Sequence, residues 1–380
     1  MNKHLYRVIF NKAQGLLVVV AEIARAHGKG SSNDNRGKPR QLRQEQAQPL
    51  FFTRPILPIA IGLTLGSILF TINPAHADII ADKAAPKNQQ ATVLNTDNGQ
   101  LLVNIQTPSA AGVSRNAYSA LNIPQEGAVF NNSRSNVQTQ LGGWVKGNPW
   151  LATGSARIIL NEVNSSSPSL LQGYMEVAGQ RAQMVIVNPS GISCDGCGFI
   201  NTSRGTLTTG TPILNGGALQ GYRVQKGLIS IQGKGLDARQ TDYTDIIARA
   251  VQINATILAN ELNITTGANE VDAANTTPTP ITASMAAPGL AVDVSNLGGM
   301  YAGRIHLIAT EAGVGVRNAG TIGATVGGFT LTADGRLENT GSMSSSGTTQ
   351  VTLRDTLTNT GTLYAQVDLS LNTQGDIIND

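Results

Sequence analysis

Few residues in this chain could perform chemistry. The only two cysteines are Cys194 and Cys197, and their C-x-x-C spacing occurs in redox sites, in half of a zinc site and in local disulfides. Zinc needs four ligands, but beyond residue 77 the chain has one histidine, His306, and no second cysteine pair. Thioredoxin-like chemistry needs a βαβ setting that the sequence does not predict. We therefore expect neither a metal site nor another cofactor.

Acidic residues are the second candidates, because β-helix enzymes that degrade polysaccharides place carboxylates beside an arginine or lysine on one outer face. Asp195 lies alone between the cysteines, and the densest polar run consists of Asp237, Asp242, Asp245 and Arg249. We interpret these residues as scattered surface charge, and His306 as a strand residue on the polar face. The sequence predicts no catalytic residue and hence no enzyme, with a polysaccharide-active enzyme kept as an alternative.

A repeat near the C-terminal end predicts the fold that positions these residues. Five asparagines follow one another at steps of 22, 21, 20 and 20 residues: Asn296, Asn318, Asn339, Asn359 and Asn379. Each comes two places after an aliphatic residue, in turn Val294, Val316, Leu337, Leu357 and Ile377. Such a period indicates a solenoid, and it suits one coil of a parallel β-helix, whose strands stack about 4.8 Å apart. Because glycine follows four of the asparagines, we expect strand, turn, strand, with a positive φ or a side-chain-to-backbone bond at the corner.

The composition agrees with that architecture. Aromatic residues make up 4% and charged residues 13% of the chain, and 42 glycines provide for tight turns. We predict an all-β fold, a right-handed parallel β-helix from about Asp78, with its first strands as an N-terminal cap and small extra-helical hairpins beside it. Asp380 comes one residue after the last ladder asparagine, so we expect the chain to stop inside a coil, as the beginning of something longer.

The first 77 residues are built differently. Residues 55–72 are apolar and uncharged, and Ala75-His76-Ala77 after them has the form of a signal-peptidase site. We expect export by the Sec machinery and cleavage by signal peptidase between Ala77 and Asp78, with an uncleaved anchor as the alternative. This prefix has ten Lys and Arg residues against three acidic ones, so the remainder of the +3 chain carries about −4. A mildly acidic remainder without a basic-aromatic stripe predicts no nucleic-acid partner.

Two regions of the sequence resemble known families. Residues 1–25, MNKHLYRVIFNKAQGLLVVVAEIAR, resemble the extended signal-peptide region of very large exported proteins and autotransporters of Gram-negative bacteria. Asn148-Pro149-Trp150-Leu151 and Asn188-Pro189-Ser190-Gly191-Ile192 match the Asn-Pro-x-Leu and Asn-Pro-Asn-Gly-Ile signatures of the N-terminal secretion domain of two-partner-secretion exoproteins, the haemagglutination activity domain of filamentous haemagglutinins. Ser190 departs from the second signature. The string CDGCGFINTSR, residues 194–204, is similar to the contact-dependent growth-inhibition type.

This resemblance covers nearly the whole chain and implies its organisation: an extended signal peptide (1–77), a secretion domain (78–295) and the first coils of a haemagglutinin-type repeat shaft (296–380). It implies a secretion-targeting domain of a large surface exoprotein, which passes the periplasm and serves adhesion or contact-dependent growth inhibition at the Gram-negative cell surface. The implied partner is an outer-membrane β-barrel transporter whose periplasmic domains recognise the chain before it folds outside. A host or neighbouring-cell receptor is a further implied partner, and the toxic part would lie far downstream of residue 380.

The resemblance also suggests roles for single residues. The Asn-Pro motifs initiate turns, so the following residues are either corners of the β-helix or part of the surface read by the transporter: Asn148, Pro149, Leu151, Asn188, Pro189, Gly191 and Ile192. In an exported protein the default for Cys194 and Cys197 is a local disulfide, which would rigidify the turn after the second motif. A short surface adhesin or haem-acquisition protein that binds a receptor directly is the remaining alternative.

Overall fold

The computed structural model describes residues 6–11, 16–21 and 78–380, in two units, Met1–Phe70 and Thr71–Asp380. The described part of the first unit is a hairpin of β1 (Tyr6–Asn11) and β2 (Leu16–Ala21), which pair antiparallel with Tyr6 opposite Ala21. No helix in these ranges is both long and apolar enough to span a membrane. The proposed cleavage residue Ala77 lies outside the described residues.

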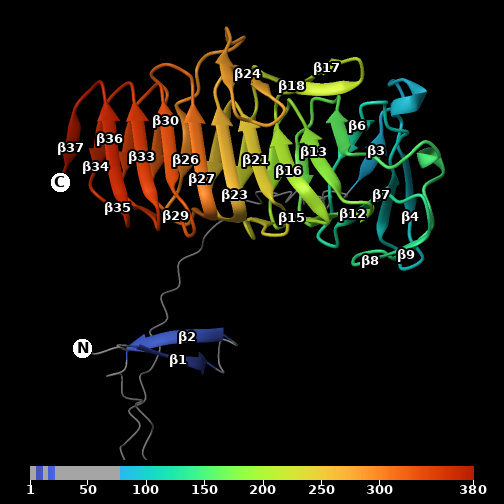
Figure 1. Cartoon of the computed structure of the whole chain (residues 1–380), viewed down its shortest axis with the longest axis horizontal. Coiled ribbons are helices and arrows are strands. Elements are labelled where there is room, and N and C mark those ends of the chain that lie inside the picture. Colours follow the sequence, from blue (N-terminus) through green and yellow to red (C-terminus); the bar gives the residue numbers. More distant parts are fainter. Residues whose placement is uncertain (1–5, 12–15, 22–77) are drawn as a thin grey trace, which may run out of the picture. The chain divides into compact units, whose positions relative to one another are not determined.

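The second unit is a parallel β-helix whose strands stack along its long axis (Figure 1). From β11 (Ser169–Leu171) onward, each complete coil contributes one strand to each of three faces, and we number the faces in chain order. The first face consists of nine short parallel strands: β11 (Ser169–Leu171), β14 (Ile192–Cys194), β19 (Leu228–Ile231), β22 (Ala250–Ile253), β26 (Leu290–Val294), β28 (Gly315–Asn318), β31 (Leu337–Asn339), β34 (Leu357–Asn359) and β37 (Ile377–Asn379).

The other two faces form one continuous sheet, because two strands of 11 residues, β23 (Thr256–Thr266) and β27 (Gly299–Ala309), run through both. The second face otherwise contains β5 (Leu101–Asn104), β7 (Ala128–Asn132), β12 (Tyr174–Gly179), β15 (Cys197–Ile200), β20 (Leu236–Ala238), β29 (Thr321–Ala324), β32 (Ser342–Ser345) and β35 (Thr362–Ala365). The third contains β6 (Val113–Leu121), β10 (Ile158–Val163), β13 (Ala182–Val187), β16 (Thr202–Thr208), β21 (Tyr243–Ala248), β30 (Phe329–Ala333), β33 (Thr348–Leu353) and β36 (Asp368–Thr373).

Antiparallel strands cover the N-terminal end of the β-helix, as predicted. β3 (Ile79–Ala81) pairs with β6, and β4 (Thr92–Asn95) pairs with β5, with the short 3-10 helix η1 (Lys87–Gln89) between them. A hairpin of β8 (Val137–Thr139) and β9 (Gly143–Val145) packs beside the β-helix. A four-stranded antiparallel sheet does the same farther along: β17 (Thr211–Asn215), β18 (Ala218–Val224), β24 (Asn269–Asp272) and β25 (Pro278–Pro280). The predicted β-helix with cap and extra-helical hairpins is confirmed.

Alternation along each strand builds the core. Val316, Leu337 and Leu357 occupy equivalent positions of three successive coils, and all three are buried. Their neighbours Glu338 and Thr358 lie on the outer side and are half-buried. A period of two therefore places one column of aliphatic side chains inside each face and polar side chains outside, which explains how so few aromatic residues suffice for the core.

The asparagine ladder exists, but it begins one rung later than predicted. Asn318, Asn339 and Asn359 each donate a side-chain hydrogen bond to the side-chain oxygen of the next asparagine, at 2.7, 2.6 and 2.7 Å, the last to Asn379. Asn296 is exposed, and Val294 lies opposite Asn318 instead. The assignment of Asn296 was wrong because Gly298 comes four positions after Val294, whereas Gly320 comes two positions after Asn318. Because Val294 occupies the position before it in the column, the buried side-chain oxygen of Asn318 accepts no hydrogen bond within residues 78–380.

The corners use the second of the two expected devices, because the Asn339 and Asn359 side-chain amides donate to the Gly341 and Gly361 carbonyl oxygens at 3.4 and 3.2 Å. In the described residues only Asn201 and Asn275 have a positive φ among non-glycine residues, so the ladder asparagines act through side-chain bonds alone. The glycines two places on do not need a positive φ either. A Cβ added at Gly320 or Gly341 would lie 2.1 Å from the carbonyl oxygen of the glycine one coil earlier. These turns require glycine because successive corners stack too closely for a side chain.

Candidate functional site

The first Asn-Pro motif forms a tight corner before β10. Asn148 precedes the 3-10 helix η2 (Pro149–Leu151), and its side-chain oxygen accepts a hydrogen bond from the backbone N–H of Trp150 at 3.0 Å. Its side-chain amide donates to the carbonyl oxygens of Ile105 and Asn131, each at 2.9 Å. Leu151 is buried in the core, whereas Pro149 is exposed. Asparagine caps the helix here, and proline suits its first position.

The second motif has the same hydrogen-bond pattern at the corner between β13 and β14. The Asn188 side-chain oxygen accepts from the N–H of Ser190 at 2.9 Å, and its amide donates to the Ser167 carbonyl and the Ser169 hydroxyl, each at 3.0 Å. Gly191 has φ +117°, which glycine adopts without strain. The Ser190 hydroxyl donates to the Ser165 carbonyl at 3.0 Å, so serine has a bonding role of its own in this turn.

Burial decides what these asparagines can do in the folded protein. Asn148 and Asn188 are both buried, and each side-chain oxygen and amide is hydrogen-bonded. Removing the Asn148 side chain would take this amide donor from the Ile105 and Asn131 carbonyl groups. Removing the Asn188 side chain would take it from the Ser167 carbonyl and the Ser169 hydroxyl. In the folded chain both asparagines therefore hold corners together and are inaccessible to a partner, while Pro149 and Trp150 present the surface of the first corner.

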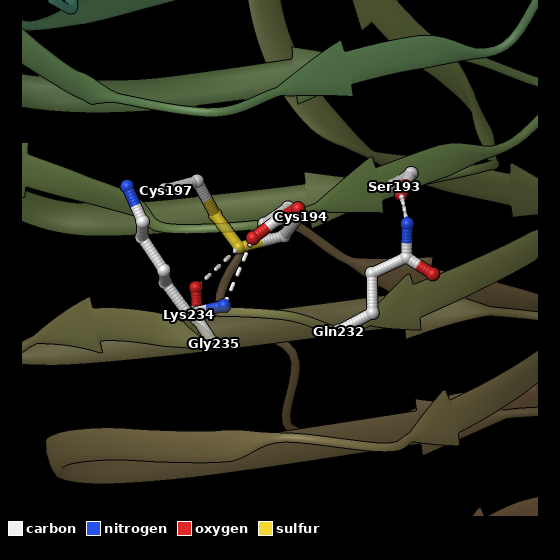
Figure 2. Close-up of a disulfide and its surroundings, with 7 residues drawn as sticks. Ser193, Cys194, Cys197, Gln232, Lys234 and Gly235 are labelled. Atoms are coloured by element: carbon white, nitrogen blue, oxygen red, sulfur yellow. Dashed lines mark hydrogen bonds between the residues drawn. A yellow bond between two sulfur atoms is a disulfide. The ribbon is translucent and has the colours of Figure 1, made fainter. Parts of the chain in front are cut away.

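Cys194 and Cys197 form a disulfide bond at the corner between the first and second faces (Figure 2). Cys194 stacks between Leu171 and Ile231, and Cys197 pairs with Leu236, so the disulfide occupies two inward positions that neighbouring coils fill with aliphatic side chains. Outside it, the Asp195 carboxylate accepts from the backbone N–H of Lys234 at 2.8 Å. This arrangement joins adjacent faces through the core, and both sulfur-bearing residues are buried.

The polar run that resembled a catalytic cluster does not assemble. Each member pairs with a different residue: Asp237 with Arg239, Asp242 with Arg181, Asp245 with Arg204, and Arg249 with Glu311. The Arg239 guanidinium lowers the pKa of Asp237 to about 2. In the described residues no group of three His, Cys, Asp or Glu side chains could hold a metal ion.

Our interpretation of this run as surface charge was wrong for two of its members. Asp245 is fully buried, and burial raises its pKa although Arg204, Asn263 and Thr206 all bond to the carboxylate. Arg249 is buried as well. Both lie where extra-helical segments pack on the β-helix, since Arg204 also donates to the Ala274 carbonyl at 2.8 Å and Arg249 to the Met285 carbonyl at 2.9 Å. These ion pairs attach the extra-helical segments.

His306 lies on the outer side of β27, as predicted, and is half-buried. Burial lowers its pKa, which favours the neutral imidazole. Asp78, on the far side of the predicted cleavage bond, is exposed at the beginning of the second unit.

Comparison with known proteins identifies the class to which this fold and these corners belong. A family model described as the TPS secretion domain matches residues 77–339, and one described as the extended signal peptide of the type V secretion system matches residues 1–48. The first match spans more than half of the chain, so the chain belongs to the TPS, or two-partner secretion, domain family.

Individual relatives show which members of this family the chain is similar to. The chain is similar to a Toxin CdiA of Yersinia pestis, with 53% identity over 96% of this chain, and to a tRNA nuclease CdiA-2 of Burkholderia pseudomallei, with 46% identity over 89%. It spans only 11% and 10% of those proteins. The crystal structure of a filamentous hemagglutinin secretion domain matches with a TM-score of 0.67 and 30% identity, covering 80% of this chain and 99% of that one.

These matches confirm the predicted family and its growth-inhibition branch. The chain contains a secretion-targeting domain, which is not itself catalytic, behind an extended signal region. It is exported through the periplasm to the surface of a Gram-negative cell, and its family implies a cognate outer-membrane transporter.

Proposed function

We propose that residues 78–295 are the signal by which the periplasmic domains of the cognate transporter select this chain, and that residues 296–380 are the first coils of the shaft that follows. The observation that carries this proposal is the shared geometry of the two Asn-Pro corners, at Asn148 and Asn188, which match the family signatures and bond in the same way 40 residues apart. Neither corner lies in the repetitive ladder.

Selection takes place before folding. Because both asparagine side chains are buried and paired in the folded domain, any contact between them and the transporter must precede folding. An extended segment can pair with a sheet edge of the transporter by β-augmentation. Once outside the cell, each coil stacks on the one before it, and this nearest-neighbour stabilisation favours outward movement without a nucleotide.

Maturation removes the leader between Ala77 and Asp78 in this scheme, because the A-x-A pattern ends at Ala77 and the β-helix begins two residues later at Ile79. The whole protein would serve contact-dependent growth inhibition, which is supported by relatives that are named as toxins. Any nuclease activity named for a relative would belong to regions beyond the matched part. The match to the secretion-domain family supports a targeting role for this segment rather than an enzymatic one.

Replacement of Asn188-Pro189 by Ala-Ala tests the proposal. We expect the variant to accumulate in the periplasm, with inner-membrane export and leader removal intact. Release of the variant equal to that of the wild-type chain would contradict the role of the corner in secretion. Circular dichroism of the purified variant separates two causes: a normal β spectrum with failed release supports recognition, and loss of structure supports a folding defect at the exit.

A further inference from the structure

The two tryptophans of the chain lie unusually exposed in one short segment. Trp144 and Trp150 are the only tryptophans, six residues apart, and their side chains are 68% and 45% exposed. By contrast the core takes other large aromatic residues, among them Tyr118, Phe130 and Phe199. Exposed large apolar side chains that gather in one segment mark interaction surfaces.

The fold holds both tryptophans outward. Trp144 lies on β9 opposite Gln138, and its neighbour Val145 packs the β8–β9 hairpin onto Leu102 and Val129. Alternation along β9 therefore points Trp144 away from the β-helix. The Glu176 carboxylate fixes the hairpin by accepting the backbone N–H groups of Gln140 and Leu141, each at 2.7 Å. In Figure 1 this hairpin lies at the capped end.

Trp150 is presented by the Asn-Pro corner itself. Its backbone N–H donates to Asn148, its indole N–H donates to the Thr92 hydroxyl at 3.2 Å, and its carbonyl accepts from the Thr107 hydroxyl at 2.7 Å. In the folded domain Asn148 is therefore enclosed in the corner, whereas the Trp150 side chain is not needed to fill the core.

The same segment has a charge unlike the rest of the mature chain. Residues 127–161 contain Arg134, Lys146 and Arg157 and no acidic residue, within a mature chain of about −4. None of the three forms an ion pair with a carboxylate of residues 78–380. A partner of this segment needs apolar pockets and a surface rich in carboxylates.

The spacing suits an extended strand. Side chains alternate along a strand, so Trp144 and Trp150 fall on the same side, about 20 Å apart at about 3.3 Å per residue. Lys146 falls on that side too. If the even-numbered residues of this strand hydrogen-bond to the partner, the backbone groups of Pro149 point to the opposite edge. The N–H that proline lacks is then not needed for pairing with the partner. One side of the unfolded segment thus offers two tryptophans with a lysine between them.

We propose that Trp144 and Trp150 are the anchors by which the transporter's periplasmic domains hold this segment as an added strand, with Lys146 against an acidic surface. The inference rests on the proposed function and names the contacting residues of that interaction. Tryptophan is enriched among the few residues that dominate binding interfaces. Because the folded core uses neither tryptophan, a role before folding accounts for large apolar side chains at these two positions.

The test compares Trp144→Ala/Trp150→Ala with Trp144→Phe/Trp150→Phe and with a control, Leu297→Ala/Val326→Ala, whose side chains are 86% and 85% exposed far from the segment. Full-length variants are produced with the cognate transporter, and released and periplasmic chain are measured. Urea-unfolded chain is also diluted onto the isolated periplasmic domains, a binding measurement that does not depend on folding. We expect release and binding of the Ala pair to fall about tenfold or more, with the thermal midpoint unchanged. The Phe pair should lose less release and binding than the Ala pair, and the control should remain near wild type.

Release and binding of the Ala pair equal to wild type would overturn the anchor role. If Asn188-Pro189→Ala-Ala still blocked release in that case, the proposed function would stand and only the anchors would be wrong. If wild-type chain itself failed to bind the periplasmic domains, the proposed function would fall together with the anchors.

Discussion

The shaft coils and the Asn-Pro corners both use buried asparagines, but in opposite ways. In the shaft, Asn318, Asn339 and Asn359 bond to the equivalent asparagine of the next coil, so each coil presents the same donor to its successor. In the corners, Asn148 and Asn188 bond to backbone and hydroxyl groups of unlike segments. A ladder can be extended without limit, whereas each corner occurs once. The comparison separates a repetitive region that stabilises from a singular region that can be recognised.

The largest expected effect comes from the aliphatic column beside the ladder. Leu337→Ala should lower the free energy of unfolding of the C-terminal coils by about 2–5 kcal/mol, because it opens a cavity in a close-packed core. Glu338→Ala, one place along and on the outer side, should change it by less than about 0.5 kcal/mol. Hydrogen exchange should show fraying confined to the shaft, with residues 148–210 still protected. Equal effects of the two variants would mean that the register of the strands differs from this structure.

A somewhat smaller effect is expected within the ladder. Asn339→Ala should cost about 1–3 kcal/mol, because it removes the acceptor of Asn318 and the donor to Asn359 in a buried site. Asn296→Ala is the matched control, since Asn296 belongs to the same sequence repeat but is exposed outside the ladder. Chemical denaturation of both variants measures the difference. A cost for Asn296 equal to that for Asn339 would contradict the register of β26 on β28.

The smallest effect concerns a surface ion pair of the secretion domain. Arg239 lowers the pKa of Asp237 from its ordinary value of 3.8 to about 2, so the unfolded chain binds more protons between these values and stability falls as the pH drops through this window. Because solvent screens this largely exposed pair, we expect its contribution to stability to be small. Asp237→Asn and Arg239→Gln should each flatten this part of the stability curve. Unchanged pH dependence in both would remove the pair from the account.

Periodicity and turn signatures predicted much of this molecule. The spacing of Asn318, Asn339, Asn359 and Asn379 predicted coils, and the inward positions of Leu337 and Leu357 followed from alternation. The prediction that Asn296 belongs to the ladder was wrong because the turn after Val294 is two residues longer, which changes the register without changing the local motif. The local sequence around an asparagine reveals neither a lengthened turn nor the residue that lies opposite in the next coil. It therefore cannot distinguish a buried asparagine from an exposed one.

The sequence predicted where the two Asn-Pro corners lie, but not that their asparagine side chains are buried. The Asn-Pro motifs located both corners, but burial of Asn148 and Asn188 depends on carbonyl groups as distant in sequence as Ile105. Asp245 and Arg249 were wrongly assigned to the surface because extra-helical segments bury them, and the sequence repeat does not predict those segments. The exposure of Trp144 could have been suspected from alternation along its strand, since Val145, Val137 and Leu141 of that hairpin pack on the β-helix and Trp144 does not.

The most direct test of the central claim is release itself. The full chain is expressed in a Gram-negative host with and without the cognate outer-membrane transporter, and the chain in the medium is quantified and sequenced from its N-terminus. The account predicts release only when the transporter is present, as a folded β-rich chain that begins at Asp78. Equal release without the transporter, or retention inside the cell with it, would contradict the assignment of this chain as a substrate of two-partner secretion.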